Sequence, residues 1–462
     1  MKRLYYTYIL SLFCLAAYSQ NFGLGDNFSS EIFDRMPVQP KLIRGDYSNL
    51  PSNYSLKKYC PYTGSQGDFG TCTSWSTAYY ARTICEAINN NWTDKQKISQ
   101  ETFSPTFVYA LVKKITDLDC NGGADTYYAM KLIKDKGVPK LSDLPYECAS
   151  AGIITQILYT AAAKYKIDDA VALWGRNGAN KDKILSVKKA LSENRPVCMS
   201  FNVYDSFWHN SSDVWSGKTS SPSDTLVGGH SICIIGYDDT KYGGAFEIVN
   251  SWGMSWGASG YCWIPYSTFT QYANYAVQMV CEKKLPSNKF SGSLKFKLYS
   301  GAEMNANLIT NGIKHYKLTN GYTSGTKYRV YISNNEPAYV YIISSDLQNN
   351  VSKIFPPDNT TSAHLPYKQS NIAIPDESWY IETDNTVGTD YICVLYSAEQ
   401  LDIEVIISKI KNGSGTFYDK INSALGTKTV PQTNINYGNN EISFLAESQK
   451  TVVPIVTEIT HN

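Results

Sequence analysis

Cys72 is the residue best placed for nucleophilic chemistry, because it follows a loop with three glycines and opens a stretch with helical spacing. The positive end of a helix dipole favours the thiolate, which is the nucleophilic form of cysteine. Gln66 lies one short loop upstream, so its amide and the Cys72 backbone N–H could point at the same carbonyl oxygen. Two such donors would form an oxyanion hole. These residues predict attack on a carbonyl carbon.

A base and a residue to orient it stand further along the chain. His230 is one of five histidines, follows Gly228 and Gly229, and is expected to open an apolar strand. Glycines permit close backbone approach, so a ligand could reach the ring. Asn250 could accept a hydrogen bond from the imidazole, and the indole of Trp252 could exclude water beside it. Cys72, His230 and Asn250 would then act as nucleophile, base and orienting residue.

The hydrophobic pattern around these residues changes along the chain from the spacing of helices to that of strands. Helical spacing is found at residues 72–88, 104–115, 126–136 and 183–194. Short apolar strands are expected at residues 197–203, 231–237, 246–250 and 261–265. Helices first and strands second indicate an α+β domain of two lobes, with the cleft between them.

The composition changes after about residue 284. Strands are expected at residues 293–299, 327–333, 338–343 and 391–395, and turns rich in Asn, Gly and Pro separate them. Residues 403–407 read as a buried strand and 418–425 as a short helix. This pattern predicts a β-rich, sandwich-like C-terminal domain.

Several segments resemble those of one peptidase family, papain and the cathepsins. Those segments are residues 66–72, 228–233 and 250–257, together with the Cys-Asn-Gly-Gly run at 120–123. The resemblance extends over about residues 50–284. It implies a two-lobed papain-like fold, in which a helical lobe faces a β-barrel-like lobe, and a cysteine peptidase without cofactor or metal. A second, weaker resemblance, through residues 339–397, is to a bacterial β-rich module of unknown function.

The family resemblance also implies a role for each matching residue. Cys72, His230 and Asn250 would be catalytic, and Gln66 would complete the oxyanion hole. The substrate would meet a further set of residues, namely Gly122, Gly123, Asp125, Gly229 and Trp252. A protein or peptide is the expected substrate.

This sequence departs from the family pattern at three places. Thr73 follows the nucleophile where the family has Trp. Phe69 stands where the family has the cysteine that usually pairs with Cys120, so Cys120 either stays free or takes another partner, for which Cys148 is the candidate. Ala124 and Asp125 replace an aromatic residue and a proline in the wall of the main specificity pocket. A preference for bulky apolar side chains in that pocket is therefore not carried over.

The first residues predict export. A positive start is followed by a short apolar run at residues 9–17 and a cleavage pattern before Gln20, as in a bacterial signal peptide. We expect a secreted, periplasmic or surface protein without membrane insertion. Its expected divisions are a signal peptide (1–19), a spacer or short latch across the cleft (20–49), a peptidase domain (50–284) and a β-rich domain (285–462).

Composition and spacing exclude some partners. A formal net charge of +1 argues against nucleic acid. No Cys/His spacing typical of zinc is present. A monomer is expected. Tyr316, Tyr328 and Tyr331 could form a glycan-binding or surface-binding face on the C-terminal domain, although such ladders are more often cross-strand packing.

Two other functions compete with peptide hydrolysis. One is another acyl transfer on the same scaffold, of the amidase or transglutaminase type. Transglutaminase-like sites usually use Asp as the third member, whereas this chain has Asn250. The other is a non-enzymatic surface-binding protein with a dead peptidase lobe. Such a lobe usually loses one of its catalytic residues, and here all are present.

Overall fold

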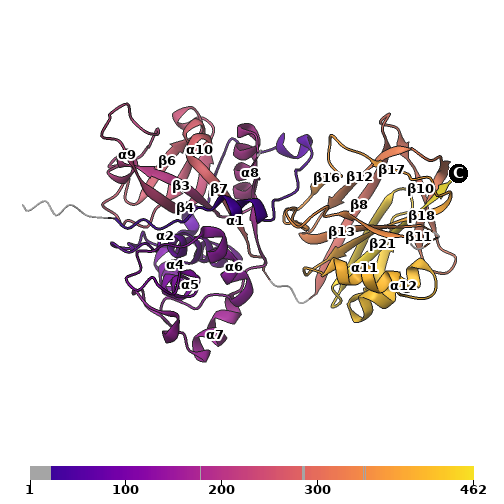
Figure 1. Cartoon of the computed structure of the whole chain (residues 1–462), viewed down its shortest axis with the longest axis horizontal. Helices are drawn as coiled ribbons and strands as arrows, with labels where there is room; N and C mark the ends of the chain where they lie inside the picture. The colour runs from indigo at the N-terminus through magenta and orange to yellow at the C-terminus, as the bar shows by residue number, and fades with distance from the viewer. Residues whose placement is uncertain (1–21, 177, 284–286, 347, 349) are drawn as a thin grey trace, which may run out of the picture.

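The computed structural model describes residues 22–462 except 177, 284–286, 347 and 349. The expected signal peptide lies outside these residues. The chain forms two bodies side by side along the long axis of the molecule, the first made by residues before 284 and the second by residues after 286 (Figure 1). Within the described residues, no helix has the length and apolar character needed to cross a bilayer.

The helical lobe of the first body is built around Cys72. The chain coils from α2 (Cys72–Ser74) through a π-helical stretch (Trp75–Arg82) into α3 (Thr83–Asn89), as the spacing of 72–88 predicts. The other helices of the first body are α4 (Lys95–Gln100), α5 (Pro105–Val112), α6 (Thr126–Lys136), α7 (Gln156–Ala162), α8 (Asn180–Ser192), α9 (Asp205–Trp208) and α10 (Tyr266–Tyr272).

The other lobe is an antiparallel sheet in the order β2-β7-β3-β4-β5-β6, with β1 added to β4. Its strands are β1 (Asn53–Ser55), β2 (Asp169–Ala172), β3 (Val197–Tyr204), β4 (Leu226–Asp238), β5 (Ala245–Val249), β6 (Tyr261–Pro265) and β7 (Ala273–Val280). The prediction that His230 opens its strand is wrong, because β4 begins at Leu226. Gly228 and Gly229 pair with Val203 and Asn202 of β3, so they extend the strand.

The second body consists of two further sheets. One has the order β10-β11-β21-β18-β13-β14, with β15 on β13. Its strands are β10 (Ala306–Ile309), β11 (His315–Tyr322), β13 (Ala338–Ser345), β14 (Val351–Phe355), β15 (His364–Leu365), β18 (Gly388–Ser397) and β21 (Val452–His461). The other sheet has the order β16-β12-β8-β20-β19, with β17 on β12 and β9 on β8. Its strands are β8 (Asn288–Leu298), β9 (Glu303–Met304), β12 (Lys327–Asn334), β16 (Ser370–Ile374), β17 (Ile381–Glu382), β19 (Ile435–Tyr437) and β20 (Ile442–Ser448).

The two sheets share one core, since Leu294 and Val330 of one and Val340 and Ile455 of the other belong to the same buried cluster. The predicted fold class, an α+β papain-like part followed by a β-rich sandwich-like part, is confirmed. Two of the tyrosines considered for a binding face, Tyr316 and Tyr328, are buried, so packing is their role.

One element of the second body was predicted with the wrong type. Residues 403–407 belong to a helix, α11 (Ile403–Lys411), which packs with α12 (Phe417–Leu425) against a sheet face. Its buried residues, Ile403, Ile406, Ile407 and Ile410, recur with helical period. The side chain of Asp402 caps the first turn. A run of β-branched residues favours a strand, but the helical spacing of the buried residues and the Asp402 cap favour a helix.

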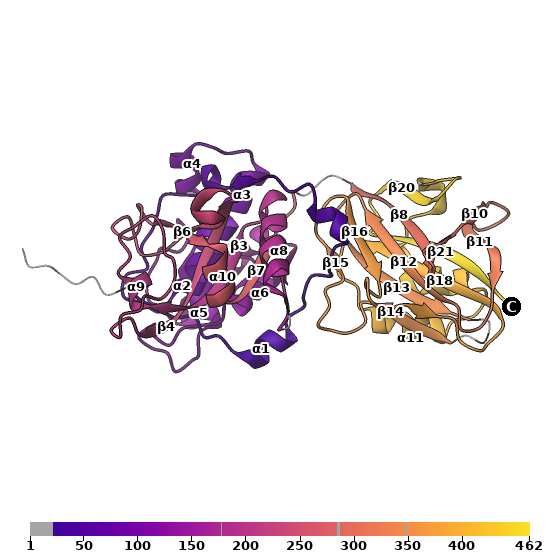
Figure 2. The same ribbon diagram turned by 90° about the horizontal axis from the view of Figure 1, so that it is seen from above.

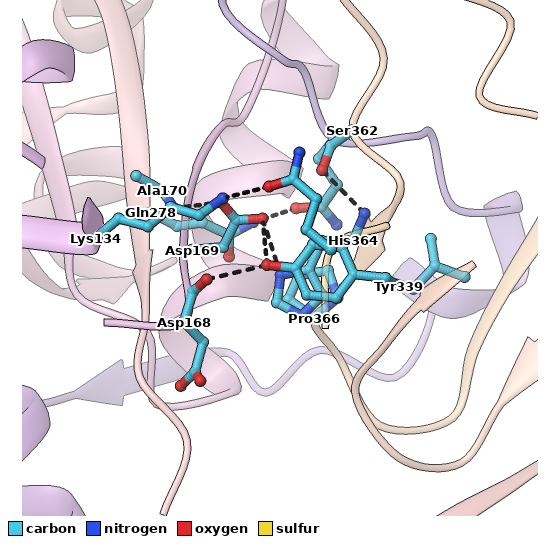
Figure 3. A network of polar contacts seen from close by, with 12 residues as sticks. Lys134, Asp168, Asp169, Ala170, Gln278, Tyr339, Ser362, His364 and Pro366 are labelled. Atoms are coloured by element: carbon cyan, nitrogen blue, oxygen red, sulfur yellow. Dashed lines mark hydrogen bonds and ion pairs between the residues drawn. The ribbon is translucent and has the colours of Figure 1, made fainter. Parts of the chain in front are cut away.

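The first and second bodies meet at a polar network centred on Asp169 of β2 (Figure 3). Its carboxylate contacts Lys134 at 2.7 Å, and His364 and Tyr339 of the second body at 3.2 and 3.3 Å. Burial opposes the charge, but the hydrogen bond and charge from His364 and the charge of Lys134 keep the pKa of Asp169 below its ordinary value. A buried carboxylate with such partners stays ionised.

Candidate active site

Cys72 lies at the first position of α2 and is fully buried. Burial raises the pKa of its thiol strongly, and the nearby charge of Asp26 raises it further. Hydrogen bonds from backbone groups, including that of Cys72 itself, act in the opposite direction without cancelling the shift. The thiol is therefore held in its protonated form in the arrangement described here.

His230 is hydrogen-bonded to Asn250. The ring Nε2 lies 2.8 Å from Asn250 Oδ1, and Trp252 stacks on the imidazole with ring centroids 4.4 Å apart. The Nδ1 atom on the other side of the ring has no hydrogen-bond partner within the described part of the chain. Burial lowers the pKa of His230 to about 4, against the opposing effect of the Asn250 hydrogen bond. The imidazole is therefore neutral at physiological pH.

The side-chain amide of Gln66 is hydrogen-bonded through both its oxygen and its nitrogen. Its Oε1 accepts a hydrogen bond from Ser251 Oγ at 2.5 Å, which turns the Nε2 amide toward the cleft. That Nε2 donates to the backbone oxygen of Gly23 at 3.0 Å and to Phe69 O at 2.7 Å. The indole Nε1 of Trp252 also donates to Gly23 O, at 3.0 Å. A peptide carbonyl oxygen of the chain itself thus accepts from the two side-chain donors that the sequence predicts for a substrate.

That carbonyl belongs to the segment expected as a spacer or latch (20–49), which we call the leader. Its residues 22–27 are called the cleft segment below. The ring of Phe22 stacks on Trp252, with centroids 5.0 Å apart. The backbone N–H groups of Gly25 and Asp26 both donate to Gly229 O at 3.1 Å. A Cβ atom added to Gly25 would lie 2.0 Å from Gly70 O, so only glycine permits this close approach. The cleft segment therefore fills the space beside Cys72.

The other predicted substrate residues also meet the cleft segment or its neighbours. Asn27 Nδ2 donates to Gly122 O at 2.7 Å. The Gly123 N–H donates to the Tyr109 hydroxyl. The adjacent Ala124 makes the backbone bonds to the leader, because its N–H donates to Gly25 O and its carbonyl accepts from Asn27 N. The disulfide Cys120–Cys148, which takes the place of the bridge usual in the family, is present in the same region.

Asp125 caps a helix, a role that was not predicted. Its carboxylate accepts from the backbone N–H groups of Tyr127 and Tyr128 and from the Tyr275 hydroxyl, and so caps α6. The group that enters the pocket beside it is Asp26 of the leader. Asp26 Oδ1 accepts from Thr126 Oγ1 at 2.7 Å, and Oδ2 accepts from Ser200 Oγ.

The pocket that holds Asp26 is polar. Ser231 Oγ lies 2.8 Å from Thr126 Oγ1, so three hydroxyl groups line it, counting Ser200. Burial raises the pKa of Asp26 to about 7, which the Ser200 and Thr126 hydrogen bonds counteract and the charge of Asp125 reinforces. Sequence reasoning missed Asp26. The alternation Phe-Gly-Leu-Gly-Asp at 22–26, two small residues between large ones, was the available signal.

Two lobes, with Cys72 on one, His230 on the other and residues 22–27 lying against both, form the arrangement expected of a cysteine-dependent hydrolase. Residues 57–283 match the family model described as papain family cysteine protease, and residues 321–400 match a domain of unknown function, DUF4384. The first segment of the chain therefore belongs to the papain family of cysteine proteases.

Similar proteins come from several kingdoms. An uncharacterized peptidase C1-like protein of Acanthamoeba polyphaga mimivirus is 28% identical over 50% of this chain and 71% of its own length. Cathepsin C of Schistosoma mansoni is 27% identical over 31% of this chain and 32% of its own length. The cysteine protease xylellain of Xylella fastidiosa is 24% identical, with a TM-score of 0.45 over 57% of this chain and 97% of the xylellain chain. The chain thus spans between a third and seven tenths of these two curated relatives.

Proposed function

We propose that the protein is an exported cysteine peptidase that hydrolyses peptide bonds through Cys72, His230 and Asn250. The observation that carries the proposal is the carbonyl of Gly23, a peptide carbonyl held by Gln66 Nε2 and Trp252 Nε1 in the cleft. A site that binds a peptide backbone in this way is built for peptide substrates. The cleft segment would have to leave before a substrate could enter.

The chemistry follows from the positions of these groups. The Cys72 sulfur attacks the carbonyl carbon of the scissile bond, while its proton passes to Nδ1 of His230. Gln66 Nε2 and the Cys72 backbone N–H stabilise the oxyanion. The protonated His230 then donates to the leaving amine, and a thioester remains. Water, deprotonated by neutral His230, attacks the thioester and releases the acid and the thiol.

The closed arrangement suppresses this chemistry in two ways. The leader excludes substrate, and its burial of Cys72 and His230 favours the neutral thiol and neutral imidazole. Once the leader is gone, solvent reaches both groups, and the thiolate–imidazolium pair is no longer disfavoured by burial. The described form is therefore an inactive precursor.

Export is supported by two features. The apolar run at residues 9–17 has the pattern of a signal peptide. The disulfide Cys120–Cys148 belongs to an oxidising compartment such as the periplasm, the cell surface or the medium.

The test is active-site labelling. Purified protein, after limited proteolysis of the leader, is treated with a biotinylated epoxysuccinyl probe and with a library of dipeptidyl substrates. We expect labelling and hydrolysis in the wild type and in Cys393→Ala, whose cysteine is buried in the second body, and neither in Cys72→Ala. Hydrolysis that persists in Cys72→Ala overturns the proposal. Acyl transfer to an added amine without peptide hydrolysis supports the transferase alternative instead.

A further inference from the structure

The leader does not end at the cleft but continues between the two bodies, where both of them hold it. In Figure 2 the indigo chain of the leader passes beside β16 of the second body. Val38 forms one β-bridge with Ala172 and another with Thr361. Its N–H donates to Thr360 O, and its carbonyl accepts from Ser362 N, both at 2.8 Å. A single residue of the leader thus pairs the peptidase sheet with the second body.

The next leader residues extend along the free edge of a sheet in the second body. Leu42, which is buried, bridges antiparallel to Ile372 of β16, the outermost strand of its sheet. Ile43 N donates to Asn371 O at 2.9 Å. The carboxylate of Asp46 accepts from both Asn371 N, at 2.6 Å, and Asn371 Nδ2, at 2.8 Å. Hydrogen bonds to a charged acceptor are stronger than those between neutral groups.

The peptidase side of this contact is itself fixed by the second body. Ala172, which pairs with Val38, ends β2, and β2 begins at Asp169. Asp169 is held by His364 and Tyr339, whose rings stack with centroids 4.3 Å apart (Figure 3). The same surfaces that dock the two bodies therefore hold the leader between them.

Only residues 28–37 separate the contacts made by residues 38–46 from the cleft segment. It contains α1 (Ser30–Arg35), a helix of about 9 Å at 1.5 Å per residue. Phe33 of α1 packs on Tyr275 with ring centroids 6.0 Å apart, and Met36 is fully buried. A segment tethered this closely rebinds at high effective concentration, and release of residues 38–46 would lengthen the tether and lower that concentration.

We propose that the β-rich second body serves as a clamp, which binds leader residues 38–46 and thereby keeps the cleft segment seated over Cys72. This gives a function to the module of unknown function, and it rests on the proposed peptidase. The ligand of the clamp is a short extended segment of the same chain, recognised by addition to the edge strand β16 and by the Asp46–Asn371 pair. Activation then requires release or cutting of the leader between the clamp and the cleft.

The test measures how often the cleft opens in the uncut chain. The second-order rate of Cys72 labelling by the epoxysuccinyl probe is compared among wild type, Asp46→Ala, Asn371→Ala and the double variant. Asp46→Ala removes both hydrogen bonds, so we expect labelling about tenfold faster than in the wild type. Asn371→Ala removes only the bond from Nδ2, because its backbone N–H remains, so we expect a smaller increase, with the double variant no faster than Asp46→Ala. Glu404→Ala is the matched control, because Glu404 pairs with Lys353 on the exposed side of α11.

The outcomes separate the clamp from the peptidase. If the leader-free protein labels but Asp46→Ala and Asn371→Ala label at the wild-type rate while uncut, the clamp is refuted and the peptidase stands. If the leader-free protein does not label, the peptidase proposal fails first. Thermal unfolding of the uncut variants is measured alongside. If Glu404→Ala, with the same change in melting temperature, labels equally fast, the effect is general loosening and the clamp is also refuted.

Discussion

The seating of Asp26 predicts that the leader releases more readily as pH rises. The free carboxyl has an ordinary pKa of 3.8, and burial in the cleft raises the pKa to about 7. An acid with a raised pKa in the closed form stabilises that form fully below pH 3.8. That stabilisation is lost as the pH rises from 3.8 to 7, and the stability of the closed form no longer changes with pH above 7.

The size of the effect follows from the shift. Three pKa units correspond to about 4 kcal/mol, taken as an upper bound, at about 1.4 kcal/mol per unit. The groups that face the carboxyl are the hydroxyls of Thr126 and Ser200, the carboxylate of Asp125 and the thiol of Cys72. Closed-state binding should therefore weaken by up to about a thousandfold between pH 4 and pH 7.5.

The assay is the labelling rate of Cys72 in the uncut protein divided by the rate in the leader-free protein at each pH, which removes the ionisation of the thiol itself. We expect the ratio to rise from pH 4 to 7 and then level off. In Asp26→Asn, which keeps the side-chain shape without a titrating group, the ratio should be flat over that range. A ratio that falls with pH, or an equal rise in Asp26→Asn, would refute the reasoning.

Further consequences concern the cleft and the base. Gly25→Val should open the cleft, because its Cβ would lie 2.0 Å from a backbone oxygen, and Cys72 labelling in the uncut chain should rise at least tenfold. His230→Ala should lower kcat of the leader-free enzyme by about a hundredfold to ten-thousandfold with folding unchanged by circular dichroism. The hydroxyl-lined pocket should favour substrates with Asn, Ser or Thr over Leu or Phe at the position that enters it, and Ser200→Ala should reduce that preference in the substrate library.

Much of the peptidase part could be predicted because its chemistry is local in sequence. The loop before Cys72 and the Asn-Ser-Trp-Gly run each carry several residues with fixed spacing, and the structure brings Gln66, His230 and Asn250 to one cleft. Their catalytic roles and the domain boundaries stay predictions. The type of α11 was missed because side-chain branching outweighed periodicity in the interpretation of Ile403 to Ile407.

The leader was harder to interpret, because its conformation depends on contacts with residues far along the chain. Asp26 meets Ser200, and Asp46 meets Asn371, at separations that no local pattern encodes. The helix cap made by Asp125 was missed for a related reason. Its place in the sequence matched a pocket wall, and its carboxylate also accepts hydrogen bonds from the first backbone N–H groups of α6.

The central claim is that Cys72 forms a covalent acyl intermediate with peptide substrates. Mixing leader-free protein with a peptide ester that deacylates slowly, followed by intact-mass and peptide-level mass spectrometry, tests it most directly. The account predicts a mass increase equal to the acyl half of the ester, confined to the peptide that contains Cys72 and absent from Cys72→Ala. Turnover without that adduct, or an acyl group on another residue, would contradict it.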